Sequence, residues 1–254
     1  MKIGICRVIG NELPPRDRAG GKLKSLNHIL EREEGVDRYW ILNHLHDKQY
    51  RDTVINLLFQ KGERFEEITF DASHYGSLST FRERLCYAIN INQARNQGIR
   101  LTTITNNFCA CLDQDCFFTA NSWQSILQAI NNDQQLCPER YYYGLIMKRV
   151  IDLNRFAAED LPNQEPQLVF RKDAPRLFDP DIPFGEGDKS MLLSALGYGP
   201  GPDFAITGDR CRTVGFVFHA PAGAIASEID FSIRSKFRAE SVRRLIHRLD
   251  TIAH

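Results

Sequence analysis

The sequence predicts an α/β fold with a mainly parallel, Rossmann-like sheet flanked by helices. Three observations support this prediction. Residues 1–130 alternate short apolar runs with amphipathic helical segments, the pattern of parallel strands joined by crossover helices. The chain has 254 residues and is 43% hydrophobic, which is enough to bury one large core. The alternation becomes less regular after residue 130, so we expect a mixed second half.

The first half contains four predicted strands and four predicted helices. The strands are expected at residues 2–10, 38–45 and 64–71 and in the run that ends at residue 112; the helices are expected at 22–34, 47–63, 80–100 and 120–132. Asp47 is a plausible N-cap of its helix, and Gly62 a C-terminal stop. Thr80 and Glu83 form a capping-box pattern at the start of a long helix. Each expected strand is therefore followed by a helix.

The second half is predicted to contain three more strands and two more helices. Strands are expected at 140–151, 166–172 and 212–221, and helices at 187–197 and 230–252. No repeat, low-complexity segment or linker interrupts the chain. We therefore expect residues 1–254 to form a single domain.

Charge and cysteine usage narrow the class of protein. The 32 basic and 32 acidic residues give a formal net charge of zero, so we expect no nucleic-acid partner. No apolar run approaches the roughly 18 residues that a membrane-spanning helix needs, so we expect no integral membrane contact. The start of the chain turns polar too early for a signal peptide. The seven cysteines lack zinc-site spacing, which favours buried thiols in a reducing, cytoplasmic protein.

Two carboxylates follow the apolar run Phe108–Leu112. Asp113 and Asp115 are one residue apart, and such a pair at a strand end can offer oxygen ligands to Mg²⁺ or Mn²⁺. The alternative is that both acids are solvent-exposed side chains of a turn and bind no ligand. Ligands of parallel sheets bind beyond the carboxyl ends of the strands, so the loops at 10–21, 43–48, 71–79 and 113–118 are expected to meet at one cleft.

The order of motifs around this pair resembles a known family. Residues 94–98 read Ala-Arg-Asn-Gln-Gly, and a hydrophobic strand, Leu112, Asp113 and Asp115 follow. This order is similar to that of the nucleotide-diphospho-sugar glycosyltransferases of the GT-A fold, above all the large inverting family that includes cellulose and chitin synthases. The resemblance implies that residues 1–130 bind the nucleotide sugar and residues 131–254 form the acceptor side.

The resemblance also implies a metal site and a general base. Asp115 would be the primary ligand of Mn²⁺ or Mg²⁺, with Asp113 as its companion near the donor and His219, after a late strand, completing the shell. Asp188, at the start of a helix, would remove the proton of the acceptor, with Glu186 as the alternate. The family usually has adjacent acids here, whereas Gly187 intervenes in this chain. His219 could instead cap a strand end, and Asp188 could cap its helix.

Five further polar residues are candidates for binding the nucleotide. Arg95 could pair with a phosphate or with Asp113. Arg7 and Asn11 flank the end of the first strand, which cradles the nucleotide in this fold. Asn43 ends the second strand and Asp71 the third, so either could bond the base.

These residues together predict a metal-dependent glycosyltransferase that uses a nucleoside diphosphate donor, a UDP-sugar before others. The acceptor could be a glycan, lipid, peptide or small molecule. One alternative is a sugar-phosphate nucleotidyltransferase, because residues 18–25 faintly resemble its glycine loop. Another is a non-catalytic module that binds nucleotide sugars or carbohydrates. The basic final helix could touch an anionic membrane surface, although its acids Glu240 and Asp250 favour a solvent-exposed face.

Overall fold

The fold is described from a computed structural model, which covers residues 1–33, 35–150, 158, 161–198, 210–220 and 231–253. Within these residues the strands are β1 Ile3–Ile9, β2 Arg38–Asn43, β3 Arg64–Ile68, β4 Phe108–Leu112, β5 Cys116–Phe117, β6 Tyr142–Arg149, β7 Asn163–Arg171 and β8 Cys211–His219. The helices are α1 Gly21–Arg32, α2 Lys48–Gln60, α3 Ala72–Ser77, α4 Phe81–Ile89, α5 Ile91–Thr102, α6 Ala120–Leu136, α7 Asp188–Ala195 and α8 Phe231–Ala253.

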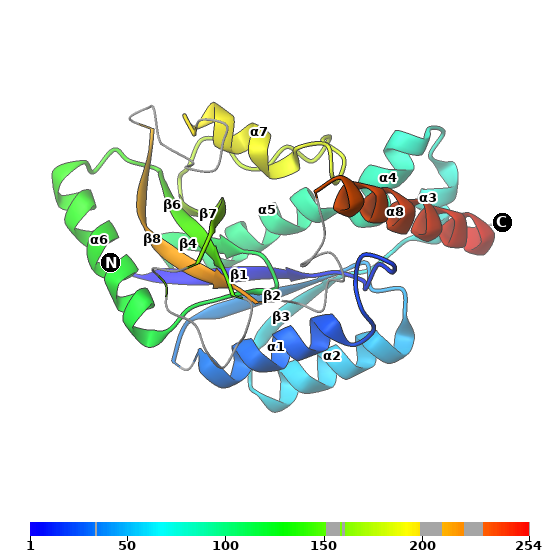
Figure 1. The fold of residues 1–254 in the computed structure, drawn as a ribbon, viewed down its shortest axis with the longest axis horizontal. Helices are drawn as coiled ribbons and strands as arrows, with labels where there is room; N and C mark the ends of the chain where they lie inside the picture. The colour runs from blue at the N-terminus through cyan, green and yellow to red at the C-terminus, as the bar shows by residue number, and fades with distance from the viewer. Residues whose placement is uncertain (34, 151–157, 159–160, 199–209, 221–230, 254) are drawn as a thin grey trace.

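The described strands form one sheet in the order β3-β2-β1-β4-β7-β6-β8-β5. Strands β1 to β4 are parallel, since β1 pairs with β2 and β4 and β2 pairs with β3 in this sense, whereas the short β5 is antiparallel to β8. β7 is antiparallel to both β4 and β6, whereas β6 and β8 are parallel. The predicted fold class, a mainly parallel sheet with a mixed second half, is therefore confirmed (Figure 1).

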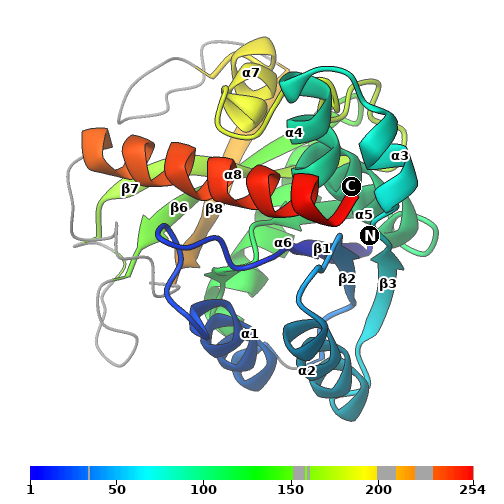
Figure 2. The same ribbon diagram turned by 90° about the vertical axis from the view of Figure 1, so that its right-hand side faces the viewer.

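Helices cover both faces of the sheet, and strand side chains alternate between them. Ile5 on β1 packs in a cluster with residues of α6, and Ile9 packs with residues of α1 and α2. Cys6, one residue along, points to the opposite face, where it meets Ile99 of α5. Figures 1 and 2 show α1 and α2 on one side of the parallel strands and α5 on the other. β1 is buried along its whole length for this reason.

Glycine at position 98 lets α5 lie close to the sheet. A Cβ atom added there would lie 3.0 Å from the Cβ atom of Cys6 and 3.2 Å from Cγ1 of Ile41. Such distances leave no room for a larger side chain without movement of the helix. Part of the Ala-Arg-Asn-Gln-Gly motif therefore serves helix packing.

The predicted helix at 80–100 is two helices in the structure, and this expectation was wrong. Asn90 has φ 47° and ψ 26°, a left-handed conformation that ends α4 and precedes α5. Asparagine tolerates this conformation better than most residues do. The break brings Asn90 Nδ2 within 3.1 Å of Asn43 Oδ1, so it connects the helices to the end of β2. The capping box of Thr80 with Glu83 and the N-cap at Asp47 are confirmed.

The final helix packs on the body of the protein through one apolar face. Val242, Leu245, Ile246 and Leu249 of α8 lie in a buried cluster with residues that include Leu13. α8 contacts α3 and α4, and Figure 2 shows it running across the molecule above β1. None of the helices among the described residues combines the length and the apolar character needed to cross a bilayer.

Candidate functional site

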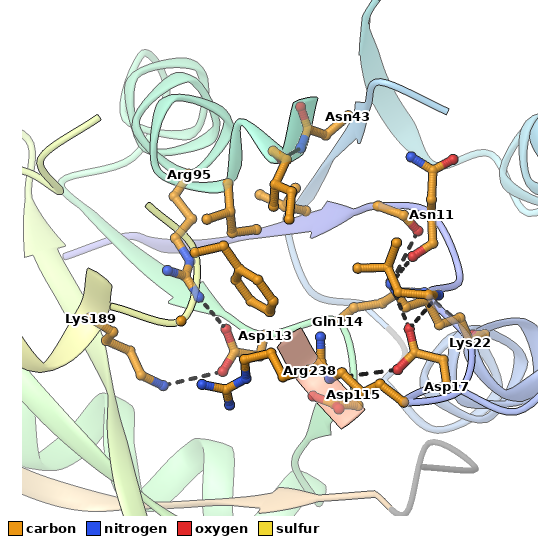
Figure 3. Close-up of a pocket in the computed structure, with 18 of the residues that line it drawn as sticks. Asn11, Asp17, Lys22, Asn43, Arg95, Asp113, Gln114, Asp115, Lys189 and Arg238 are labelled. Atoms are coloured by element: carbon orange, nitrogen blue, oxygen red, sulfur yellow. Dashed lines mark hydrogen bonds and ion pairs between the residues drawn. The ribbon is translucent and has the colours of Figure 1, made fainter. Parts of the chain in front are cut away.

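A cavity of about 710 Å³ lies at the carboxyl ends of the parallel strands (Figure 3). Parts of three predicted loops line it, namely 10–21, 43–48 and 113–118, together with residues of α5, α7 and α8. The fourth predicted loop, 71–79, is not part of its lining. Convergence of the loops at one cleft is thus found for three of the four.

Asp113 is held by two cations and an amide. Its Oδ1 accepts a hydrogen bond from Arg95 Nη2 (2.9 Å), and its Oδ2 accepts from Gln167 Nε2 (2.9 Å) and Lys189 Nζ (3.2 Å). The backbone N–H of Asp113 donates back to Gln167 Oε1 at 3.1 Å. Burial alone would raise the pKa of Asp113, but Lys189 and Arg95 lower it far more, so its pKa lies well below the usual range. The Asp113 side chain is therefore held in one position and stays ionised.

Asp115 faces His219 instead. Its Oδ2 lies 3.1 Å from Nε2 of His219, and the exposed fractions of the two side chains are 25% and 27%. Backbone pairing brings them together, because Cys116 of β5 pairs with His219 of β8 and the N–H of Ala220 donates to the Asp115 carbonyl (2.7 Å). Burial would raise the pKa of Asp115, but the neighbouring His219 outweighs it, so the pKa is lowered.

Both ring nitrogens of His219 face oxygen acceptors. Nδ1 lies 2.6 Å from Gln164 Oε1, an oxygen that can only accept, so Nδ1 carries the hydrogen. A neutral ring then presents a lone pair at Nε2 towards the Asp115 carboxylate. Two lone pairs facing each other at 3.1 Å are favourable only when a second proton or a cation lies between them. Asp115 and His219 could therefore share either a second ring proton or a bound cation.

Arg95, Asn11 and Asn43 all line the cavity. Arg95 pairs with Asp113, as the sequence suggested it could. Asn11 connects two strand ends, since its Nδ2 donates to the His44 carbonyl (2.7 Å) and its Oδ1 accepts from the His46 N–H (2.8 Å). Asn43 donates to the Ile89 carbonyl (2.6 Å). These asparagines are thus fixed in place at the edge of the cavity.

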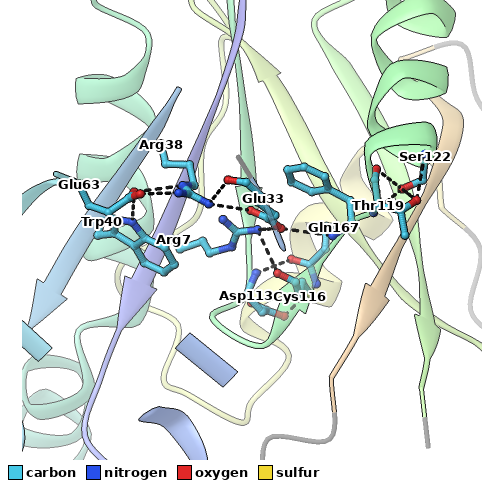
Figure 4. Close-up of polar contacts among 11 residues, drawn as sticks. Arg7, Glu33, Arg38, Trp40, Glu63, Asp113, Cys116, Thr119, Ser122 and Gln167 are labelled. Carbon is cyan, nitrogen blue, oxygen red and sulfur yellow. Dashed lines mark hydrogen bonds and ion pairs between the residues drawn. The ribbon is translucent and has the colours of Figure 1, made fainter. Parts of the chain in front are cut away.

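Arg7 does not line the cavity; it lies in the core behind the 113–118 turn, with 1% of its surface exposed. Its Nη2 donates to Glu33 Oε1 (2.7 Å) and to the Cys116 carbonyl (3.0 Å). Glu33 Oε1 also accepts from the Phe118 N–H at 3.2 Å. Figure 4 shows this pair beside a second ion pair, Arg38 with Glu63. Arg7 and Glu33 together hold β5 in place, through its first residue and the residue that follows it.

Three other predicted residues lie around the site or beyond it. Asp71 is an exposed N-cap of α3, accepting from the N–H groups of Ser73 and His74, and is not part of the lining. Glu186 is exposed and paired with Arg82 (2.9 Å), also outside the lining. Asp188 is the first residue of α7, after Gly187 as N-cap, and its side chain lies outside the described residues.

Several lining residues were not predicted. Lys189 is 6% exposed and contacts both Asp113 and Glu165 Oε2 (3.5 Å). Burial would lower the pKa of Lys189, but these two carboxylates raise it overall. Gln167 of β7, which is not part of the lining, also binds Asp113. The positions of Lys189 and Gln167 depend on tertiary contacts between distant segments, so no local sequence pattern predicts them. Further lining residues that were not predicted include Arg16, Lys22, Phe184 and Arg238.

Comparisons with known proteins identify the fold. No protein-family model matches the chain, and no curated protein matches it in sequence. Among solved structures it is similar to GalNAc-T7 with UDP, GalNAc and Mn²⁺, with TM-score 0.51 and 10% identity over 86% of this chain and 44% of that one. This likeness confirms a GT-A-like fold.

Two further structures are similar at lower scores. S. aureus TarS 1–349 in complex with UDP has TM-score 0.48 and 13% identity, covering 98% of this chain and 65% of that chain. A 4-diphosphocytidyl-2C-methyl-D-erythritol synthase has TM-score 0.42 and 13% identity, covering 94% and 99%. The chain therefore spans about two thirds of TarS 1–349 and under half of the GalNAc-T7 chain.

Proposed function

We propose that the protein is a metal-dependent glycosyltransferase that transfers a sugar from a nucleoside diphosphate donor, a UDP-sugar, to an acceptor. The observation that carries this proposal is the contact between Asp115 and His219 in a cavity at the carboxyl ends of parallel strands. Nucleotide ligands of such sheets bind at this edge. A neighbour of similar fold with UDP and Mn²⁺ supports the choice of donor.

Asp115 Oδ2 and His219 Nε2 are the atoms that would hold Mn²⁺ or Mg²⁺. Among the described residues there is no group of three or more histidine, cysteine or acidic side chains placed to hold a metal. A two-ligand site suits a cation whose remaining positions are filled by substrate phosphates and water. Such a cation would offset the negative charge that develops on the leaving diphosphate.

The residues of this chain would divide the remaining tasks. Asn11 and Asn43, held rigidly at the strand ends, would orient the nucleoside. Asp188 would accept the proton of the acceptor hydroxyl. At the same time the hydroxyl oxygen of the acceptor would bond to the anomeric carbon of the donor sugar, and the bond from that carbon to the diphosphate oxygen would break. Its place beside the buried Lys189 at the start of α7 supports this role, because α7 lies at the cavity. Asp113 would bind the donor as a carboxylate already fixed by Arg95 and Lys189.

Thermal unfolding with Mn²⁺, with UDP and with both tests the proposal. At about 100 times its Kd a ligand stabilises the folded state by about 2.7 kcal/mol. For a chain of this size such a gain raises Tm by roughly 5–10 °C. We expect the pair to raise Tm more than the two separate effects combined. Absence of any shift with UDP and metal would refute the proposal.

Substitutions at Asp115 and Asp188 distinguish binding of the donor and metal from transfer of the sugar. Asp115→Asn should remove the metal-dependent part of the Tm shift, whereas Asp188→Asn should keep it and lose turnover. Release of UDP from a UDP-sugar distinguishes an enzyme from a non-catalytic module. Release of pyrophosphate from UTP and a sugar phosphate would instead point to a nucleotidyltransferase.

A further inference from the structure

Two arginines from distant segments meet on one aromatic ring at the cavity. The guanidinium carbon of Arg16 lies 5.2 Å from the centroid of Phe184, and that of Arg238 lies 5.4 Å from the same centroid. All three side chains line the cavity. Arg16 belongs to the loop after β1 and Arg238 to α8, 222 positions apart in the numbering. Two positive charges are thus brought towards one another at the site.

The backbone holds this arrangement in place. The N–H of Arg16 donates to Oγ of Ser241 at 3.1 Å, and that hydroxyl donates to the Leu13 carbonyl at 2.8 Å. Ser241 is 2% exposed and lies three residues after Arg238 on α8. The loop that carries Arg16 is therefore fastened to the helix that carries Arg238. The Arg238 side chain also lies close to Gly185, where an added Cβ would be 3.0 Å from its Cδ.

Charges around the arginines indicate what they bind. Asp17 lies 3.7 Å from Arg16 Nε and 3.6 Å from Lys22 Nζ, so one carboxylate is shared by two cations. Asp115 and His219 line the same cavity as Arg16 and Arg238. The arginine pair therefore lies in one cavity with the Asp115–His219 contact. The fork of a guanidinium matches the oxygens of a phosphate.

We propose that Arg16 and Arg238 form a phosphate-binding pair in the cavity, with the diphosphate of the donor as its occupant. The metal pair and the arginine pair would then share the charge of one diphosphate, so part of its binding needs no metal. The choice of occupant rests on the proposed function. A phosphate group on the acceptor has the same chemistry and is the other possible source.

The test is calorimetric titration of wild type, Arg16→Gln, Arg238→Gln and Arg243→Gln with inorganic pyrophosphate, UDP and uridine in EDTA. Arg243 is the matched control, because it is an exposed arginine on the same helix, pairs with Glu240 and does not line the cavity. Loss of one charge-assisted contact should weaken pyrophosphate and UDP binding about tenfold or more in both cavity variants. Uridine binding should not change, and Arg243→Gln should behave as wild type.

The outcomes separate this inference from the proposed function. Wild type that does not bind pyrophosphate, or an Arg238→Gln variant that binds it like wild type, overturns the arginine pair even if UDP binds with metal. Pyrophosphate binding that needs both arginines supports the pair even if neither uridine nor UDP binds, in which case the proposed donor is wrong. Competition between UDP and pyrophosphate assigns the pair to the donor; simultaneous binding assigns it to a phosphate of the acceptor.

Discussion

The buried pair of Arg7 and Glu33 gives a prediction whose size follows from its contacts. Removing one partner of a buried ion pair leaves an uncompensated charge and costs about 3–5 kcal/mol. Arg7→Met should therefore destabilise the protein by this amount, because Glu33 has no exposed surface on its side chain and Arg38 approaches only its other oxygen, at 3.7 Å. Glu33→Gln should cost a similar amount, because it leaves the Arg7 charge buried.

The double variant Arg7→Met/Glu33→Gln should be more stable than either single variant. It removes both charges, and the amide oxygen of the glutamine introduced at position 33 can still accept from the Phe118 N–H. The Cys116 carbonyl then loses its bond to Arg7, and Arg38 loses its 3.7 Å contact with the carboxylate of Glu33. One unpaired buried group costs about 1–3 kcal/mol. Urea unfolding of the four proteins gives the coupling energy directly. Additive costs in the double variant would refute the assignment of a coupled pair.

Acidity provides an independent check on the same pair. Burial raises the pKa of Glu33, and Arg7 opposes that rise, so Arg7→Met should raise the pKa of Glu33 further. A carboxyl whose pKa is higher in the folded state than in the unfolded state is protonated at a higher pH in the folded state. The free energy of unfolding therefore rises as pH falls through the folded pKa. The deficit of Arg7→Met relative to wild type should shrink on acidification towards the unfolded pKa of about 4.3. A constant deficit over that range would contradict the reasoning.

Three further predictions concern other parts of the molecule. Among the seven cysteines, a thiol reagent at pH 8 should label Cys86 and Cys137 first in the native protein, because the other five are buried; mass spectrometry of the labelled peptides checks this order. Burial lowers the pKa of His46 to about 4, so the unfolded state binds more protons between that value and about 6.5, and stability should fall as pH decreases through this window. His46→Phe should make that fall shallower in urea unfolding at several pH values; equal slopes would contradict it. Gly98→Val should destabilise by about 1–3 kcal/mol, because its side chain meets Cys6 and Ile41; an unchanged Tm would show that α5 moves freely.

The parallel half of the fold could be predicted because its signals are local. Alternation of strand and helix, the cap at Asp47 and the capping box at Thr80 each depend on a few neighbouring residues. The position of the break at Asn90 could not be predicted, because its conformation depends on a contact with Asn43 at the end of β2. β5 has only two residues and exists through pairing with β8, so no sequence pattern marks it.

In the candidate site, too, residues with a local sequence signal could be predicted and residues placed by tertiary contacts could not. Asp113 and Asp115 follow a strand that the sequence marks clearly, and both line the cavity. Arg7 was expected beside the nucleotide, yet it shares the buried face of Ile5 and Ile9 on a fully buried strand. Its alternation with these residues was a usable signal for burial. Lys189 reaches Asp113 across 76 residues of sequence, and only tertiary structure brings them together.

The fastening of the loop after β1 to α8 has a consequence for biosynthesis. The parallel strands β1 to β4 lie in the first 112 residues and are synthesised well before α8. Leu245 and Arg238 of the last helix nevertheless form part of the cavity lining. A nascent chain would therefore lack a wall of the cavity until translation has passed residue 245. The complete cavity is therefore present only in chains that include α8.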